Sequence, residues 1–117
     1  MTFEEIKDLQ IRNIIANASE MKHLVKQCLS IVDSSTAKDD EVVMWINSAV
    51  SDMIEVKGID VANNLSDGLI QGAIVMHVKS KFGMCDINEK NQADKTYNSI
   101  CTNLSLSSRY RLEEVIE

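Results

Sequence analysis

Residues 69–111 read LIQGAIVMHVKSKFGMCDINEKNQADKTYNSICTNLSLSSRYR, and they say most about the architecture of the chain. Their first part predicts an apolar helix that ends at Phe82-Gly83, after which a polar turn follows. Their second part predicts a helix in which Tyr97 lies seven residues, or two turns, before Leu104. The stretch therefore predicts a small helical body that ends in an ordered tail, LSLSSRYR.

Composition favours one small helical domain. Of the 117 residues, 44% are apolar and 4% are aromatic, so the core must be aliphatic. The chain has no proline and four glycines, which suits helices and argues against a sandwich with many tight turns. We therefore expect an all-α fold, a small bundle of four to five helices with an extended C-terminal tail.

The charge balance limits the partners. Eighteen acidic and twelve basic residues give a net charge of −6, which argues against wrapping of nucleic acid, because phosphate binding needs a concentrated basic surface. No segment approaches the roughly 18 continuous apolar residues of a membrane span, so we expect no membrane partner. The N-terminus is acidic where a signal peptide would be basic, and we expect the chain in the cytoplasm or in a particle assembled there. Three cysteines without a CxxC pair indicate buried or half-buried thiols.

Apolar periodicity predicts the helices and their ends. Weak amphipathic patterns cover residues 3–18 and 20–31, and clearer ones cover residues 40–57 and 69–82. The expected caps and stops are, in chain order, Asp39 or Asp40, Gly58, Ser66-Asp67, Gly83, and Asn88 or Asn91. The expected inner stripes are Val42, Ile46, Ala49, Val50, Met53 and Lys57; Leu69, Ile70, Ala73, Ile74, His77 and Lys81; and Ala93, Tyr97, Ile100, Cys101 and Leu104. After the last stripe, LSLSS is expected to be extended, because serine competes for backbone hydrogen bonds and leucine alternates with serine.

The histidines and cysteines form no recognisable site. His77 lies within an apolar stripe, where a core or subunit-contact histidine is a simpler interpretation than a ligand or a base, and His23 is expected in solvent. A zinc site from His77, Cys85 and Cys101 matches no known ligand spacing, and a Cys–His nucleophile pair has no surrounding motif. We expect no catalytic residue, no cofactor and no metal. Trp45, at the edge of its stripe, is either a core filler or an interface anchor.

Three segments follow a known pattern. A helix begins after a D-D-E cap in AKDDEVVMWINSAVSDMI, the next helix reads LI-x-x-A-I-x-x-x-V-K-x-x-F-G, and the last reads Y-x-x-I-x-x-x-L-S-L-S-S-x-Y. In these motifs the chain resembles the small head–tail connector proteins (head-completion or adaptor proteins) of long-tailed bacteriophages and prophages. The resemblance covers residues 24–111, and its closing motif is the most specific part. His77 stands where the family usually has an aromatic residue.

The resemblance implies a structural virion protein that transforms no substrate. Such proteins typically form a dodecameric ring between the portal and the next neck or tail protein, extend the DNA exit channel and complete the head. The implied partners are the portal protein, the next neck protein (a stopper or tail terminator), further copies of the chain, and DNA that passes without sequence-specific binding. The implied location is the head–tail interface of the virion, which is assembled in the cytoplasm of the bacterial host. Acidic channel walls would suit this role, since they repel phosphate.

Within one domain, 1–117, we expect an N-terminal addition (1–22), a helical body (23–104) and a docking tail (105–117). An extended segment with flanking arginines can add backbone hydrogen bonds and ion pairs to a receiving surface on the portal or a neighbouring subunit. The residues expected to dock are Leu104, Leu106, Arg109, Tyr110 and Arg111. Two other interpretations stay open: a stand-alone helical adaptor or regulator, and a small Cys/His enzyme or metal protein.

Overall fold

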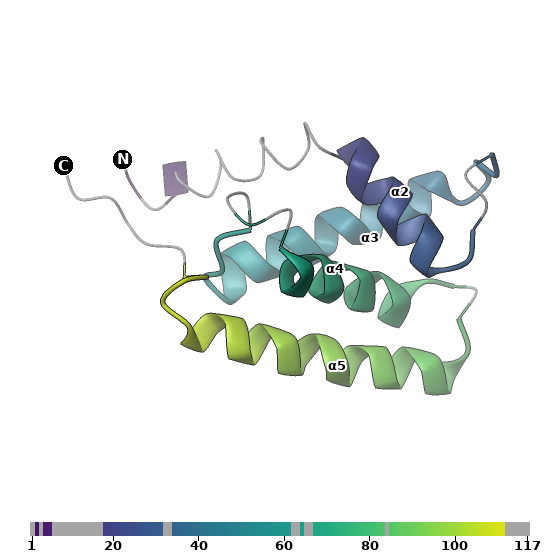
Figure 1. Cartoon of the computed structure of the whole chain (residues 1–117). Coiled ribbons are helices and arrows are strands. Elements are labelled where there is room, and N and C mark those ends of the chain that lie inside the picture. The colour runs from purple at the N-terminus through teal and green to yellow at the C-terminus, as the bar shows by residue number, and fades with distance from the viewer. Residues whose placement is uncertain are drawn as a thin grey trace.

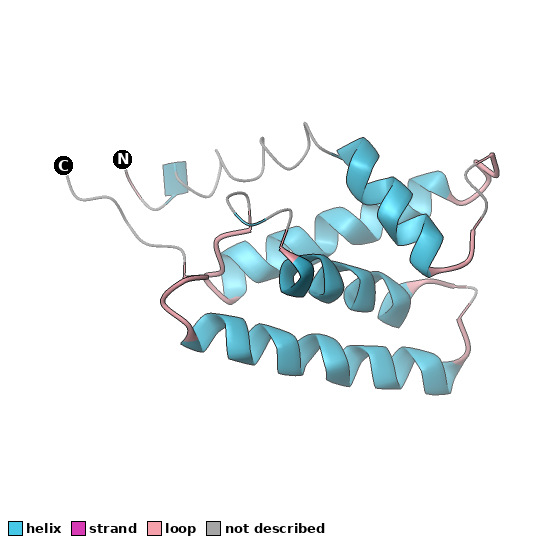
Figure 2. Ribbon diagram, in the orientation of Figure 1, coloured by secondary structure: helices cyan, strands magenta, loops and turns pink. Residues whose placement is uncertain are grey.

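The structure is a computed structural model that describes residues 2, 4–5, 18–31, 34–61, 64, 67–83 and 85–111. The helices in these ranges are α2 (Ala18–Cys28), α3 (Asp39–Ser51), the π-helix η1 (Asp52–Val56), α4 (Gly68–Lys81) and α5 (Ile87–Leu106). They pack side by side (Figure 1), and between them run loops and turns (Figure 2). The prediction of an all-α fold with four to five helices is confirmed. Across the same ranges, β pairing is limited to one isolated bridge between Ile59 and Arg111.

Helix α4 is the central element of the bundle. It packs against α5, α3 and α2, and Figure 1 shows it between α3 and α5. Asp67 caps it, as predicted, by accepting a hydrogen bond from the backbone N–H of Leu69 at 2.8 Å. Its buried residues lie on most of its circumference and are Ile70, Ala73, Ile74, Val75, His77, Val78 and Ser80. Leu69 and Lys81 were predicted on the inner stripe, but both are exposed. Leu69 lies about 100° round the helix from Ile70, and Lys81 lies in the last turn, where its ammonium group reaches solvent.

Helix α3 begins at Asp39, but neither Asp39 nor Asp40 caps it. Lys38 occupies the N-cap position and makes no capping hydrogen bond through its side chain. The Asp39 carboxylate instead pairs with the ammonium group of Lys26 on α2, at 2.8 Å. Lys26 is buried and also donates to the carbonyl of Ser35 at 2.7 Å. The prediction of an aspartate cap was wrong because a buried charge needs a partner more than a helix end does.

Helix α3 continues directly into the wider turn η1. There the N–H of Lys57 donates to the carbonyl of Asp52 at 3.2 Å, five residues earlier. Gly58 then ends the helical segment with a φ of 64°, the left-handed conformation expected for a stop at this position. The apolar pattern predicted one uninterrupted helix over residues 40–57, because a single π turn leaves no period of its own in the sequence.

Helix α5 is longer than predicted at both ends. Asp86 caps it by accepting the N–H of Glu89 at 2.8 Å, so neither Asn88 nor Asn91 is the cap. Its inner face is as predicted, with Ala93, Tyr97, Cys101 and Leu104 buried and Ile100 half-buried. The helix continues to Leu106, so the extended conformation predicted from Leu104 onward is wrong for its first three residues. Packing of Leu104 against the core outweighs the weak preference of serine for other conformations.

Helix α2 begins at Ala18 and ends at Cys28, three residues earlier than the pattern predicted. It crosses the expected boundary between residues 22 and 23, and Met21 from the expected N-terminal addition is buried in the core. Cys28 is exposed, contrary to the expectation of buried or half-buried thiols. Most of the helix predicted over residues 3–18 lies outside the described residues.

The core is one mainly aliphatic cluster that joins α2, α3, α4 and α5. Its largest fully buried side chains are Phe82, Met53, Ile54, Ile59, Ile70, Ile74 and Leu104. Such burial stabilises the fold by about 1.5–3 kcal/mol for each large aliphatic or aromatic side chain. Over the residues that can be described, no helix has the length and apolar character needed to cross a membrane.

Candidate functional site

Residues 107–111, which we call the C-terminal turn, fold back onto the body after α5 (Figure 1). The N–H of Tyr110 donates to the carbonyl of Ser107 at 3.1 Å, which closes the turn. The carbonyl of Tyr110 accepts the N–H of Asp60 at 2.7 Å, and Arg111 forms an antiparallel bridge with Ile59. The segment that follows η1 is thereby joined to the segment that follows α5.

Asp67 links the C-terminal turn to the start of α4. Its Oδ2 accepts the phenol of Tyr110 at 2.8 Å and lies 3.4 Å from the guanidinium of Arg109. The hydrogen bond from Tyr110 and the capping bond from Leu69 hold the pKa of the Asp67 carboxyl below its usual value. Arg109 also lies over the Tyr110 ring, 5.2 Å from its centroid, but its side chain is 72% exposed. The ion pair therefore adds little stability, and the tyrosine makes the main link.

The structure divides the five predicted docking residues into two groups. Leu104 and Tyr110 are 1% and 7% exposed, and they belong to the core. Leu106 is 78% exposed, and Arg109 and Arg111 are also exposed. Two of the five residues thus hold the C-terminal turn against the body, and the other three face solvent.

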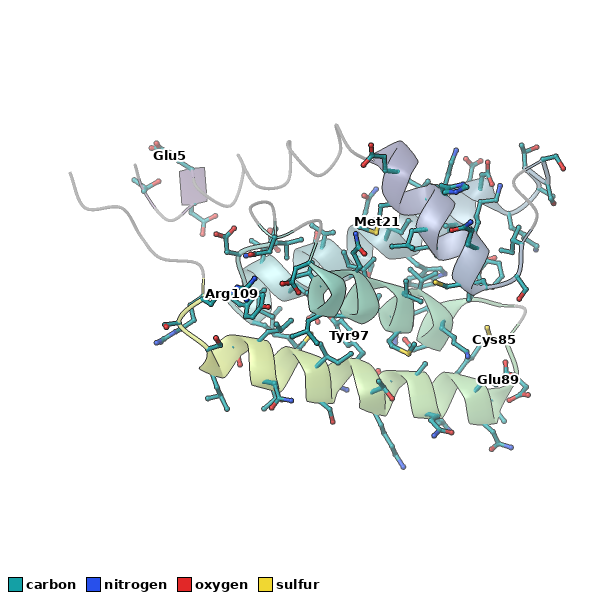
Figure 3. The ribbon with its side chains drawn as sticks, viewed as in Figure 1. Glu5, Met21, Cys85, Glu89, Tyr97 and Arg109 are labelled. Carbon is teal, nitrogen blue, oxygen red and sulfur yellow. The ribbon has the colours of Figure 1, made fainter. Side chains whose placement is uncertain are left out.

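Sequence reasoning missed two exposed aliphatic residues at this end of the body. Val56 on η1 is 75% exposed and Leu69 on α4 is 52% exposed. Both lie close in sequence to residues that contact the C-terminal turn, and Figure 3 shows the labelled Arg109 at this same end. The available signal was position: Val56 lies off the inner stripe of its helix, so its side chain had no predicted neighbour.

Trp45 is half-buried against the core cluster. Its Nε1 donates to Oε2 of Glu41 at 3.3 Å, and the same oxygen accepts the N–H of Gly83 at 3.0 Å. Glu41 thus joins α3 to the residues that follow α4. Trp45 fills part of the core and leaves part of its surface available.

A partly buried polar network joins η1 and the residue after it to α5. Tyr97 and Lys57 both donate to Oδ2 of Asp52, at 2.5 and 2.6 Å. Burial alone raises the pKa of the Asp52 carboxyl, but these two hydrogen bonds outweigh it, so the pKa lies below its usual value. Burial and the bond to Asp52 together raise the pKa of Tyr97, so the phenol stays protonated.

His77 lies beside this network on α4. Its ring packs edge-on against Tyr97, with centroids 4.8 Å apart, and its Nε2 lies 3.1 Å from Oγ of Ser48. The side chain is 7% exposed, and this burial lowers the pKa of His77, so the imidazole is neutral at neutral pH. The contacts are those of a histidine that packs within the core.

Within the part of the chain that the structure describes, His77, Cys85 and Cys101 are not brought together as a nucleophile pair or a metal site. Burial raises the pKa of the thiols of Cys85 and Cys101, so both stay protonated and are poor nucleophiles at neutral pH. Figure 3 shows Cys85 beside Glu89 near the start of α5, away from the labelled Tyr97. No group of three or more His, Cys, Asp or Glu residues in the described ranges is placed to hold a metal ion.

A family model described as phage connector protein matches residues 21–111. The matched range takes in most of α2, all of α3 to α5 and the whole C-terminal turn. Comparison with curated proteins and with solved structures finds no match. Because the family model covers well over half of the 117 residues, the chain belongs to the phage connector protein family, which makes it a structural protein of the phage head–tail connection.

Proposed function

We propose that this chain is one subunit of a ring between the portal and the next neck or tail protein of a long-tailed phage. In this position it extends the DNA exit channel and completes the head. The family match over residues 21–111 is the observation that carries the proposal. A ring subunit needs a stable body and exposed contact surfaces, and the aliphatic core and the exposed residues at the C-terminal turn fit that need.

The end of the body at the C-terminal turn is the surface that docks onto the portal. Leu106 supplies an exposed aliphatic side chain, and Arg109 and Arg111 supply guanidinium groups suited to carboxylates on a partner. Leu104 and Tyr110 support this surface without contacting the portal, because their burial in the core holds the C-terminal turn in place. Arginine is enriched among the residues that dominate protein interfaces, and Leu106 adds exposed apolar surface beside the two arginines.

DNA passes such a ring without binding to it. The segment Asp39–Val56, which forms α3 and η1, carries five acidic residues and no basic one. A dodecamer would carry about −70 formal charges in total, from −6 per copy. Such a charge disfavours adhesion to the phosphate backbone and leaves the duplex free to move.

Portal binding tests the proposal. Leu106→Glu, and separately the pair Arg109→Ala and Arg111→Ala, should each weaken binding to the portal protein of the same phage by about 30-fold, the loss typical of a dominant interface residue. The matched control is the pair Lys79→Ala and Lys81→Ala on α4, which removes the same charge at another place and should leave binding unchanged.

The measurement is size-exclusion chromatography with light scattering on mixtures of the chain and the portal, with circular dichroism as the check on folding. If the chain forms a ring, the complex holds many copies of the chain for each assembled portal ring. Portal binding with unchanged affinity in both variants would place the docking surface elsewhere. Binding of a single copy to a single partner would identify a stand-alone adaptor instead.

A further inference from the structure

The second half of α5 and the two residues after it form the longest run of uncharged residues in the chain. Residues 96–108, TYNSICTNLSLSS, contain no Asp, Glu, Lys or Arg, although these types make up 26% of the chain. Part of the run packs inward, and the rest is exposed. We call the exposed helical part the α5 face, which consists of Thr96, Asn98, Ser99, Thr102, Asn103 and Leu106.

The composition of the α5 face conflicts with the helix that carries it. Asn, Ser and Thr are weaker helix formers than Ala, Glu or Lys by up to about 0.7 kcal/mol each. A helix side that only meets water is usually built from strong helix formers such as Ala, Glu and Lys. Conflict between local preference and observed structure is expected where a surface has another task.

The hydroxyl groups near this face are already hydrogen-bonded within the helix. Thr96 donates to the carbonyl of Gln92 at 3.0 Å, and Thr102 donates to the carbonyl of Asn98 at 2.9 Å. Water can therefore be removed from both threonines without leaving an unpaired donor, whereas burial of a charged side chain would carry a large penalty. Leu106, 78% exposed, adds an aliphatic side chain at the end of the face.

A second uncharged surface lies on α3. Residues 42–51, VVMWINSAVS, also lack charge. Met44, 52% exposed, and Asn47 face solvent there, with Val43 and Ser51 half-exposed beside them. We call these four residues the α3 face. Helices α3 and α5 each pack against α4, and α4 lies between them in the bundle (Figure 1).

We propose that the α5 face of one copy packs against the α3 face of the next copy. This inference rests on the proposed function, because a closed ring requires each subunit to offer two different surfaces on two sides. Both faces lack charge and both carry an exposed apolar side chain, which matches the depletion of charged residues at the centre of protein interfaces. DNA fits the α5 face less well, since the face has no cation for phosphate.

The size of the α5 face explains why copies would need a template to assemble. The α5 face runs from residue 96 to residue 106, which is about 15 Å along the helix axis, and a strip about 10 Å wide along it covers about 150 Å². Stable interfaces cover about 800 Å² on each partner. The contact is therefore weak between free copies and becomes effective when the portal holds them side by side.

Paired cysteines test the contact directly. In a Cys28→Ser background, the variant with both Ser99→Cys and Asn47→Cys is treated with a short bismaleimide, alone at rising concentration and in the complex with the portal. Adjacent copies should be linked into a ladder of dimers, trimers and larger species. Each single variant is a control that should give no ladder, because the proposed contact joins two different faces. The pair Ser99→Cys and Gln27→Cys, which moves the second thiol to exposed Gln27 on α2, should give none either.

Introducing one charge on each face gives an independent measurement. Ser99→Lys should weaken assembly on the portal about tenfold, and adding Asn47→Glu should restore it, because the two charges would meet across the contact. Failure of the rescue, a ladder equally strong with the α2 pair, or no ladder in a complex that holds many copies would each overturn the inference. In that last case the ring would stand without this contact. Linked copies that do not bind the portal would leave the contact standing and overturn the proposed function.

Discussion

Removal of the Tyr97 hydroxyl tests whether the network of Asp52, Lys57 and Tyr97 stabilises the fold. In Tyr97→Phe the ring keeps its packing against His77, while the hydrogen bond to Asp52 and the weaker one between the phenol and the Cys101 thiol are lost. Hydrogen bonds to charged groups contribute about 1.5–3 kcal/mol. Asp52 keeps Lys57 as a partner and its side chain is 28% exposed, so water can replace part of the lost bond. We therefore expect the free energy of unfolding to fall by about 1–2 kcal/mol.

Urea unfolding followed by circular dichroism measures this loss, and thermal unfolding should show a midpoint lower by about 4–10 °C. A double-mutant cycle with Asp52→Ala isolates the bond, because Tyr97→Phe should cost close to nothing once the carboxylate is gone. An equal loss in both backgrounds would refute the assignment of the stabilisation to this hydrogen bond. So would a loss below about 0.5 kcal/mol in the wild-type background.

Four further outcomes follow from the same structure. Phe82→Ala should lower the free energy of unfolding by about 3–5 kcal/mol, since the ring is 2% exposed and would leave a cavity; a urea midpoint close to that of the wild type would contradict this. Gly58→Ala should lower the free energy of unfolding by about 1–2 kcal/mol in the same assay, because φ is 64°, a conformation that residues with a Cβ disfavour. The space around the new methyl group is open, so no clash adds to this loss. An unchanged midpoint would show that η1 can end in another conformation. Stability should fall as pH drops below about 6.5, because burial lowers the pKa of His77 in the fold and the unfolded chain binds the proton more readily; His77→Gln should remove this step in thermal melts at pH 7.5 and 5.5. A second loss should follow below about pH 4, where the low pKa of the folded Asp52 carboxyl makes the unfolded chain the better proton acceptor, and Asp52→Asn should reduce it.

Local sequence signals determined much of the fold. The inner stripe of α5 and the apolar character of α4 were readable from helical periodicity, because burial along a helix repeats every 3.6 residues. The stop at Gly58 and the cap at Asp67 were readable because each depends on the conformation of one residue and its immediate neighbours. The motifs of residues 24–111 also indicated the family that the match over residues 21–111 confirms.

The tertiary structure decided the features that depend on residues far apart in the chain. Asp39 does not cap α3, because its carboxylate pairs with the buried ammonium group of Lys26 on α2. No local sequence pattern indicates this pairing. The first three residues of LSLSS are helical because Leu104 is buried in the core, and this burial outweighs the local preference of serine for other conformations. Tyr110 was predicted as a docking residue, but Asp67 binds its phenol from 43 residues away and holds it in the body. The solvent exposure of Leu106 and Met44, on which the proposed contacts depend, was likewise set by how the helices pack. Periodicity shows which side of a helix is apolar, but it does not show which side the neighbouring helices leave uncovered.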